Sequence, residues 1–413
     1  MGSPVIATVA PCPDMTSHAT STVPEPIQRA LRILSLAYFV QVTGALSVVG
    51  CLAAIAHEWS LADAEAAYLI SAFGVTFALA APLMQVWIGH FGRRRQLLIG
   101  LAVFAASCFA FAFAPGYGVL LASRVLMGLG AALISPVLGA LGTGLVSREH
   151  QGSALATVLF GLSVASLAGM PAAAWIADGW GPRWLFVGVA VATVLTAAMI
   201  ARFVPDAPGG ERIRLSTVTA LLSDGVTFSA LCVVFFIATG VFATYAFLAP
   251  IIHRDYGADA HTVTLTLLVS GVAGVIGNLY VERAARRYSA EGLLLSGLLM
   301  LGADLLFLLL APQRIGLLYG ALIVWAVATA ILWPTQQRRV VELKPELRGI
   351  GLALTASFLF CGIGFGSAVA GWVYPVFGYA GTLCCSLLFL SAALAALRHS
   401  VRGARARALS SGA

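Results

Sequence analysis

Twelve long apolar runs follow one another along the chain, most of them separated by only a few residues. A helix that crosses a bilayer needs about 20 mostly apolar residues. The runs are also too uniformly apolar for the alternating strands of a membrane barrel. The sequence therefore predicts an all-α membrane protein with twelve transmembrane helices, near residues 33–56, 66–88, 97–114, 118–145, 153–177, 184–204, 226–252, 262–281, 292–311, 315–336, 349–376 and 379–397.

The overall composition excludes a soluble protein. Of the 413 residues, 60% are hydrophobic and only 10% are charged, whereas soluble domains are about 25% charged. The seven cysteines are scattered and contain no C-x-x-C pair, so they predict packing residues, not a disulfide framework or a metal site.

The basic residues predict the orientation of the helices. If the N-terminus is cytoplasmic, 20 of the 24 Lys and Arg residues fall on the cytoplasmic side, only Arg183, Arg254 and Arg314 fall outside, and Arg124 lies within a span. Such an excess follows the positive-inside rule. We therefore expect a multi-pass protein of a bacterial-type inner membrane with both termini in the cytoplasm.

The chain divides into two similar halves. We expect a disordered cytoplasmic tail at 1–28, a six-helix bundle at 29–204, a cytoplasmic linker at 205–225, a second bundle at 226–398 and a basic cytoplasmic tail at 399–413. The stretch QVWIGHFGRRRQ after the second run has a counterpart in GNLYVERAARRYS after the eighth. Six helices per half give both halves the same orientation, an arrangement that places a substrate site at their interface near the midplane.

The loop between the second and third runs carries the first family-like motif. With Gly92, Arg93 and Arg94 in this loop, the chain resembles the major facilitator superfamily, and within it the bacterial twelve-helix drug and sugar exporters that include drug–proton antiporters. Gly92, Arg93 and Arg94 match the basic end of the family's conformational motif. The acidic end is missing, because Gln85, Gly89 and His90 stand at the positions of its leading Gly, its Asp and the following Arg. The resemblance implies a conformational latch in this loop, and the alternative is a plain positive-inside loop.

Two further motifs extend the resemblance. LLASRVLMGLGAA at 120–132 is similar to the family's fourth helix, where an arginine is tied to proton coupling. Arg124 takes that position; alternatives are an anion-binding role or a side chain that snorkels to the membrane interface. The run from Gly161 through Gly169 and Pro171 is similar to the antiporter motif of the fifth helix, which suggests export.

Candidate cavity residues come mainly from helices 1, 4, 7 and 10, with Asn278 from helix 8. Their alternative is ordinary interior packing. They are Tyr38, Gln41, Arg124, Tyr245, Asn278 and Trp325. Many such exporters carry an acidic residue in helix 1, but Ala45 stands there in this chain. Asp304 of helix 9 is the carboxylate deep within a span, and it is either a proton carrier or a neutral, hydrogen-bonded group.

The resemblance implies a secondary transporter, most simply a proton-coupled exporter of a small drug-like or sugar-like solute. Alternatives are a facilitator or uptake carrier without proton coupling, and a non-transporting receptor. An enzyme is disfavoured because the chain has no H-E-x-x-H, G-x-S-x-G or Walker A motif. We expect no catalytic residues, no cofactor and no metal. The expected energy source is the proton gradient. We also expect a monomer in the lipid bilayer, without a nucleic-acid partner.

Overall fold

Long helices account for the apolar runs of the sequence. A computed structural model describes residues 24–207, 215–285, 287–344 and 348–411. The long segments are α1 (Glu25–Gly50), α3 (Asp63–Trp87), α4 (Arg93–Ala112), α5 (Tyr117–Gly144), α6 (Gln151–Val164), α7 (Met170–Gly179), α8 (Pro182–Phe203), α10 (Gly225–Tyr245), α12 (Ala260–Ala284), α13 (Ala290–Leu310), α14 (Ile315–Leu343) and α15 (Arg348–Ser411). The shorter ones are α2 (Leu52–Glu58), η1 (Arg148–His150), η2 (Ala165–Gly169), α9 (Leu215–Ser223) and α11 (Leu248–Arg254).

The last helix crosses the membrane twice. Eleven segments of the described chain are long and apolar enough to span, and the last runs from Ile350 to Arg407. Its 58 residues would extend about 87 Å as one straight helix, far more than the roughly 30 Å hydrocarbon core of a bilayer. Gly378, with φ 60° and ψ −157°, breaks it into two. Only glycine adopts such a conformation readily.

Contacts with α10 show that the chain reverses at this break. Before Gly378, Gly362 packs on Phe235 and Gly366 packs on Thr239, so both elements rise in the same direction. After it, Ser386 packs near Gly240, and Ser400 donates a hydrogen bond to the carbonyl of Val226. The second part of α15 therefore returns antiparallel to α10. The predicted twelve-crossing fold is confirmed.

The fifth crossing contains a π-helical turn. It consists of α6, the π segment η2 and α7, and Pro171 stands in the first turn of α7. Proline has no N–H for the helical ladder and its ring crowds the preceding turn, so a local π turn is an expected accommodation. Gly161 and Gly169 lie directly against α1: an added Cβ would be 2.0 Å from the Ser35 carbonyl oxygen and 2.3 Å from Thr43 Oγ1, respectively.

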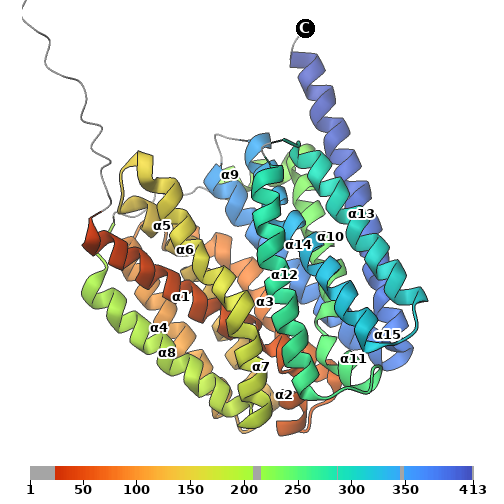
Figure 1. The fold of residues 1–413 in the computed structure, drawn as a ribbon. Coiled ribbons are helices and arrows are strands. Elements are labelled where there is room, and N and C mark those ends of the chain that lie inside the picture. The colour runs from red at the N-terminus through yellow and green to blue at the C-terminus, as the bar shows by residue number, and fades with distance from the viewer. Residues whose placement is uncertain (1–23, 208–214, 286, 345–347, 412–413) are drawn as a thin grey trace, which may run out of the picture.

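The first half of the molecule comprises α1 to α8 and the second comprises α10 to α15, with α9 between them (Figure 1). The prediction of disorder up to residue 28 is wrong for residues 25–28, which form the first turn of α1 after Pro24. Residues 1–23 and linker residues 208–214 lie outside the described chain. The C-terminal basic segment continues helically to Ser411.

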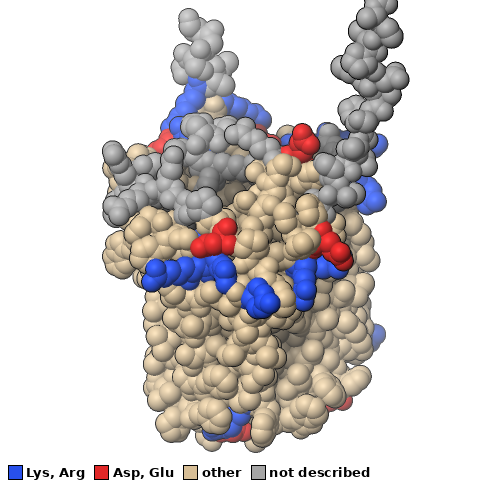
Figure 2. All heavy atoms as spheres, turned by 90° about the vertical axis from the view of Figure 1, so that its left-hand side faces the viewer, with Lys and Arg blue, Asp and Glu red and all other residues tan. Residues whose placement is uncertain are grey.

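Charge is distributed unevenly over the surface. Figure 2 shows Lys and Arg gathered in a band toward one end of the molecule, above a broad surface free of charge. That end, here called the linker side, carries the start of α10 and the C-terminal end of α15, which are joined by an ion pair between Asp224 and Arg407. The opposite end, here called the outer side, carries α2 and α11 (Figure 1). The break at Gly378 lies on this side too, because the next residue, Tyr379, borders the same cavity as Ile251 of α11.

Candidate transport site

Arg124 ties three helices of the first half together. Its side chain has no exposed surface. Nε donates to the Leu69 carbonyl of α3 at 3.0 Å, and Nη2 donates to the Ala45 carbonyl of α1 at 2.9 Å. The guanidinium also lies 4.8 Å from the centre of the Phe73 ring, a cation–π distance. Arg124 therefore does not snorkel to an interface. The position where an acidic residue was expected, Ala45, supplies a backbone carbonyl instead.

The two polar residues predicted on α1 have different environments. Gln41 is 1% exposed and accepts a hydrogen bond of 3.1 Å from the hydroxyl of Ser135 on α5. Tyr38, one turn earlier, is half-buried. Gln41 therefore lies at the contact between α1 and α5.

The two halves meet closely at α3 and α15, where small residues allow the backbones to approach. A Cβ added to Gly74 would lie 2.5 Å from the Phe360 carbonyl oxygen, and one added to Gly364 would lie 2.9 Å from the Ser71 carbonyl oxygen. Closer to the outer side, Gly371 packs against Ala64 in the same way. The contact therefore extends from the outer end of α3 to about its middle.

A second contact between the halves joins the fifth crossing to α12. A Cβ added to Gly271 would lie 2.7 Å from the Ser166 carbonyl oxygen in η2. The outer part of the crossing, α7, has five buried residues out of ten, whereas α6 on the linker side has three out of fourteen. The halves are thus packed together mainly in the outer half of the molecule.

Asn278 marks where this second contact ends. It follows Gly271 by two helical turns and so lies on nearly the same face of α12. Gly271 is buried against η2, but Asn278 is exposed. Asn278 is therefore not part of the interior packing that was the alternative to cavity lining. It lies nearer the linker-side end of α12 than Gly271 does.

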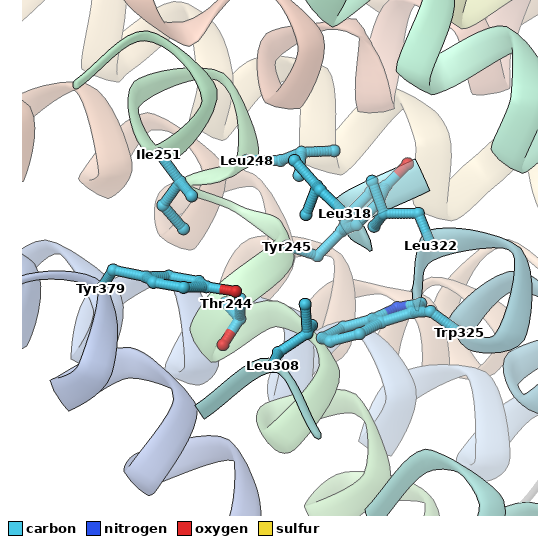
Figure 3. A pocket seen from close by; sticks show the side chains of 9 residues that line it. All are labelled: Thr244, Tyr245, Leu248, Ile251, Leu308, Leu318, Leu322, Trp325 and Tyr379. Carbon is cyan, nitrogen blue, oxygen red and sulfur yellow. The ribbon is translucent and has the colours of Figure 1, made fainter. Parts of the chain in front are cut away.

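A small cavity lies inside the second half, and it brings together two predicted residues, Tyr245 of α10 and Trp325 of α14 (Figure 3). Their rings stack with centroids 6.5 Å apart at 27°. The other lining residues are Thr244, Leu248, Ile251, Leu308, Leu318, Leu322 and Tyr379. Its volume is about 10 Å³, room for about one water molecule. A sugar-sized solute does not fit there in this conformation.

Asp304 lies on α13, one turn before the cavity residue Leu308. It is 5% exposed, and one carboxylate oxygen is buried without a hydrogen-bond partner. Its charge interacts with the hydroxyl of Tyr379 in α15. Asp304 has no hydrogen-bond partner in the described chain, which disfavours the interpretation of Asp304 as a neutral, hydrogen-bonded structural group.

The loop between α3 and α4 is completed by a carboxylate from the linker region. Asp206 Oδ1 accepts hydrogen bonds from the backbone N–H of Arg94 at 2.9 Å and of Ala207 at 2.8 Å. The N–H of Arg93 donates to the Ala207 carbonyl at 3.0 Å. A Cβ on Gly92 would lie 2.6 Å from Asp206 Oδ2, so this close approach requires glycine. Asp206 thus stands where helix α4 exposes its unpaired N–H groups.

Several polar residues were not found from the sequence. Asp206, Tyr379 and Tyr256 lie in loops or helix ends, which hydropathy does not distinguish. Arg339 of α14 was counted as a topology signal, yet it is 2% exposed and donates through Nη2 to Ser400 of α15 at 2.9 Å. The available signal was that Arg339 stands at the edge of a predicted span, three residues after Gln336, and so on nearly the same face of the helix.

Comparisons with known proteins agree with this architecture. The sequence matches the family model described as Major Facilitator Superfamily over residues 34–246 and 230–411. Inner membrane transport protein YdhP of Escherichia coli (strain K12) is 29% identical over 377 residues, which cover 89% of this chain and 96% of that protein.

Solved structures share the fold. A bacterial homolog of the human lysosomal transporter Spinster, in an inward-facing and occupied conformation, has a TM-score of 0.76 at 16% identity and covers 92% of this chain and 98% of its own. A D-xylose-proton symporter has a TM-score of 0.71 at 18% identity, with coverages of 90% and 97%. With two packed six-helix halves and a family match across nearly all of its length, this chain is a multi-pass membrane transporter, not an enzyme, and belongs to the Major Facilitator Superfamily.

Proposed function

We propose that this chain is a proton-coupled secondary transporter that exports a small drug-like or sugar-like solute by alternating access. The observation that carries the proposal is the uneven contact between the halves: they pack together in the outer half, while Asn278 is exposed toward the linker side. Alternating access requires two states in which such contacts form on one side and then on the other.

The direction of the opening follows from the proposed orientation. The basic residues gather on the linker side (Figure 2), which the positive-inside rule assigns to the cytoplasm. Under that assignment both termini are cytoplasmic, the protein lies in a bacterial-type inner membrane, and the conformation faces inward. An exporter in this state is ready to receive solute from the cytoplasm.

The solute site we propose lies between the halves near the midplane, with Tyr38 and Gln41 on one side and Tyr245 and Trp325 on the other. Tyrosine and tryptophan offer a stacking face with one polar group, which suits sugars and aromatic solutes. Arg124 holds α1, α3 and α5 together beside this region, so its charge is available to couple their movement to a proton. We expect a monomer without a cofactor or a nucleic-acid partner.

A facilitator without proton coupling is the second candidate. It is favoured by one observation, the backbone carbonyl of Ala45 in place of a helix 1 carboxylate next to Arg124.

Solute counterflow in proteoliposomes, with and without an imposed pH gradient, tests both candidates. The proposal predicts counterflow that a gradient of protons accelerates, and a changed pH dependence in Arg124→Ala or Asp304→Asn. Counterflow that ignores the gradient identifies a facilitator. No counterflow for any solute of a broad panel, with folded protein in the membrane, identifies a non-transporting receptor.

A further inference from the structure

The carboxylate of Asp304 has no neutralising partner in the described chain. No ion pair or hydrogen bond reaches it, and one of its oxygens is fully buried. An unpaired charge in a membrane-embedded site is costly. Charged residues at such depth pair with each other or mark a path for ions or protons. A bound proton is the smallest ligand that removes the cost.

Asp304 does not itself line the cavity, but its charge acts on the hydroxyl of Tyr379, which does. Leu308, one turn further along α13, lines the cavity, and so does Tyr379. Figure 3 shows the hydroxyl end of Tyr379 pointing into the group of lining side chains, close to Thr244. The α14 side chains that share the cavity, Leu318, Leu322 and Trp325, do not titrate. The cavity holds about one water molecule by volume.

A second tyrosine continues this line to the outer surface. The hydroxyl of Tyr256, in the segment between α11 and α12, donates to the Tyr379 hydroxyl at 3.3 Å. Tyr256 is half-buried at the outer end of the molecule, and burial raises its pKa above the usual range, so it stays a donor at neutral pH. Its neighbour Asp255 accepts a hydrogen bond of 2.7 Å from Tyr374.

Five titratable groups therefore face this line, among them Tyr374 of α15, which donates to Asp255. Tyr379 comes from α15, Tyr245 from α10 also borders the cavity, and Asp255 and Tyr256 come from the outer segment. Asp255 is the one charged group among them, and its carboxylate attracts protons to the outer end of the line.

We propose that Asp304 is a proton-binding site that is loaded from the outer side through Tyr256, Tyr379 and a water molecule in the cavity. A proton from outside binds the Tyr256 oxygen while the Tyr256 proton passes to the Tyr379 oxygen. The Tyr379 proton passes to the cavity water, which gives one of its protons to the Asp304 carboxylate. Each hydroxyl and the water end with the protons they began with, and the net change is one proton on Asp304.

This inference rests on the proposed function, because an antiporter that exports a solute must take up its proton from outside. The route also gives that uptake a path that is separate from the linker side. Proton loading from outside and solute entry from the cytoplasm then occur in the same inward-facing state.

Infrared titration of the purified full-length protein tests the site without any solute. The protonated carboxyl band of the parent should be lost in Asp304→Asn. Asp304→Glu should keep a titrating band at a shifted frequency, which separates loss of the site from loss of the fold. A set of carboxyl bands that is the same in the parent and in Asp304→Asn overturns the site.

A rapid pH step in the same samples tests the route. Tyr379→Phe and Tyr256→Phe should slow the change of the Asp304 band by at least about tenfold, since a positioned proton-transfer group contributes roughly 100-fold or more. Tyr280→Phe, an exposed tyrosine on α12, is the matched control and should leave the rate unchanged. Equal rates in all variants overturn the route. Flux measurements are independent: a titrating Asp304 in a protein whose counterflow ignores the pH gradient removes the proposed coupling but not the site.

Discussion

Asp206 Oδ1 lies 2.9 Å from the backbone nitrogen of Arg94, although 112 residues separate the two along the chain. The contact joins the end of the first half to the loop that enters α4. A carboxylate at the first turn of a helix satisfies an unpaired N–H and interacts favourably with the helix dipole. The loop motif of this chain lacks its own Asp at position 89, and Asp206 supplies an acidic group to the same loop from elsewhere in the fold.

Replacing Asp206 by Ala should lower the free energy of unfolding of the first half by about 1 kcal/mol, the typical value of a helix cap. Gly92→Ala should also be destabilising, because its Cβ would be 2.6 Å from Asp206 Oδ2. In the double variant, which carries both changes, that clash is absent. The double variant should therefore lose less free energy of unfolding than the sum of the losses in the two single variants. Tryptophan-fluorescence melting in detergent measures all three, with Gly118→Ala as a control at a glycine whose Cβ would meet no atom within 4 Å. Strictly additive effects would contradict the contact.

Arg124→Lys should lower thermal stability even though it keeps the charge. The planar guanidinium reaches the carbonyls of Ala45 and Leu69 at the same time, and an ammonium on a lysine stem does not reproduce that fork. Loss of one such bond costs about 1.5–3 kcal/mol when the donor is charged. Melting curves of Arg124→Lys beside Arg314→Lys, an exposed arginine at the start of α14, measure the difference. Equal melting temperatures would show that Arg124 does not tie α1, α3 and α5 together.

The crossings were predictable because lipid imposes a length and a hydropathy on each helix, and the linker and repeat followed from their order. The sequence also predicted both Tyr245 and Trp325 as cavity residues, since aromatic residues with a polar group in facing helices tend to share a cavity. It did not show which face of α12 carries Asn278, because the residues on either side of it, Gly277 and Leu279, are both apolar.

Contacts between distant segments were not predictable. Nothing in the sequence links Asp206 to Arg94, or Tyr256 to Tyr379, because each pair is brought together only when helices from different parts of the chain pack. The buried state of Arg339 was missed for a related reason: a basic residue at a helix end predicts orientation equally well whether it faces water or Ser400 of α15.

Gly74→Ala should shift the protein toward a state that is open on the outer side. Its Cβ would lie 2.5 Å from the Phe360 carbonyl oxygen and 2.9 Å from Gly364 N, both of them backbone atoms of α15 that have little freedom to yield. Overpacking of this kind costs about 1–3 kcal/mol, and every 1.4 kcal/mol is tenfold in the population ratio. Distances between spin labels at Tyr68→Cys and Trp372→Cys should lengthen.

Gly302→Ala on α13 is the matched control for this shift, because a Cβ there would meet no atom within 4 Å. It should leave the distance distribution as in the parent. An unchanged distribution in Gly74→Ala as well would mean that α3 and α15 separate without passing through this contact.

The C-terminal end of α15 should be held to α10 in a manner that depends on salt and pH. Arg407 donates to Asp224, and this bond holds the pKa of Asp224 well below its usual range while raising that of Arg407. A carboxyl group with a depressed pKa contributes stability that is complete above its free value, about 3.9, and lost as the pH falls through the depressed value. The docking should thus be constant from neutral pH to about pH 4 and weaken below it.

Because Arg407 is half-exposed, salt near 1 M, where the screening length is about 3 Å, should weaken the docking at pH 7 as well. The mobility of a spin label at Ala406→Cys in a cysteine-free background should rise under both conditions and in Arg407→Ala, but not in Arg402→Ala. A label whose mobility in Arg407→Ala still responds to salt as in the parent would show that another contact holds this helix end.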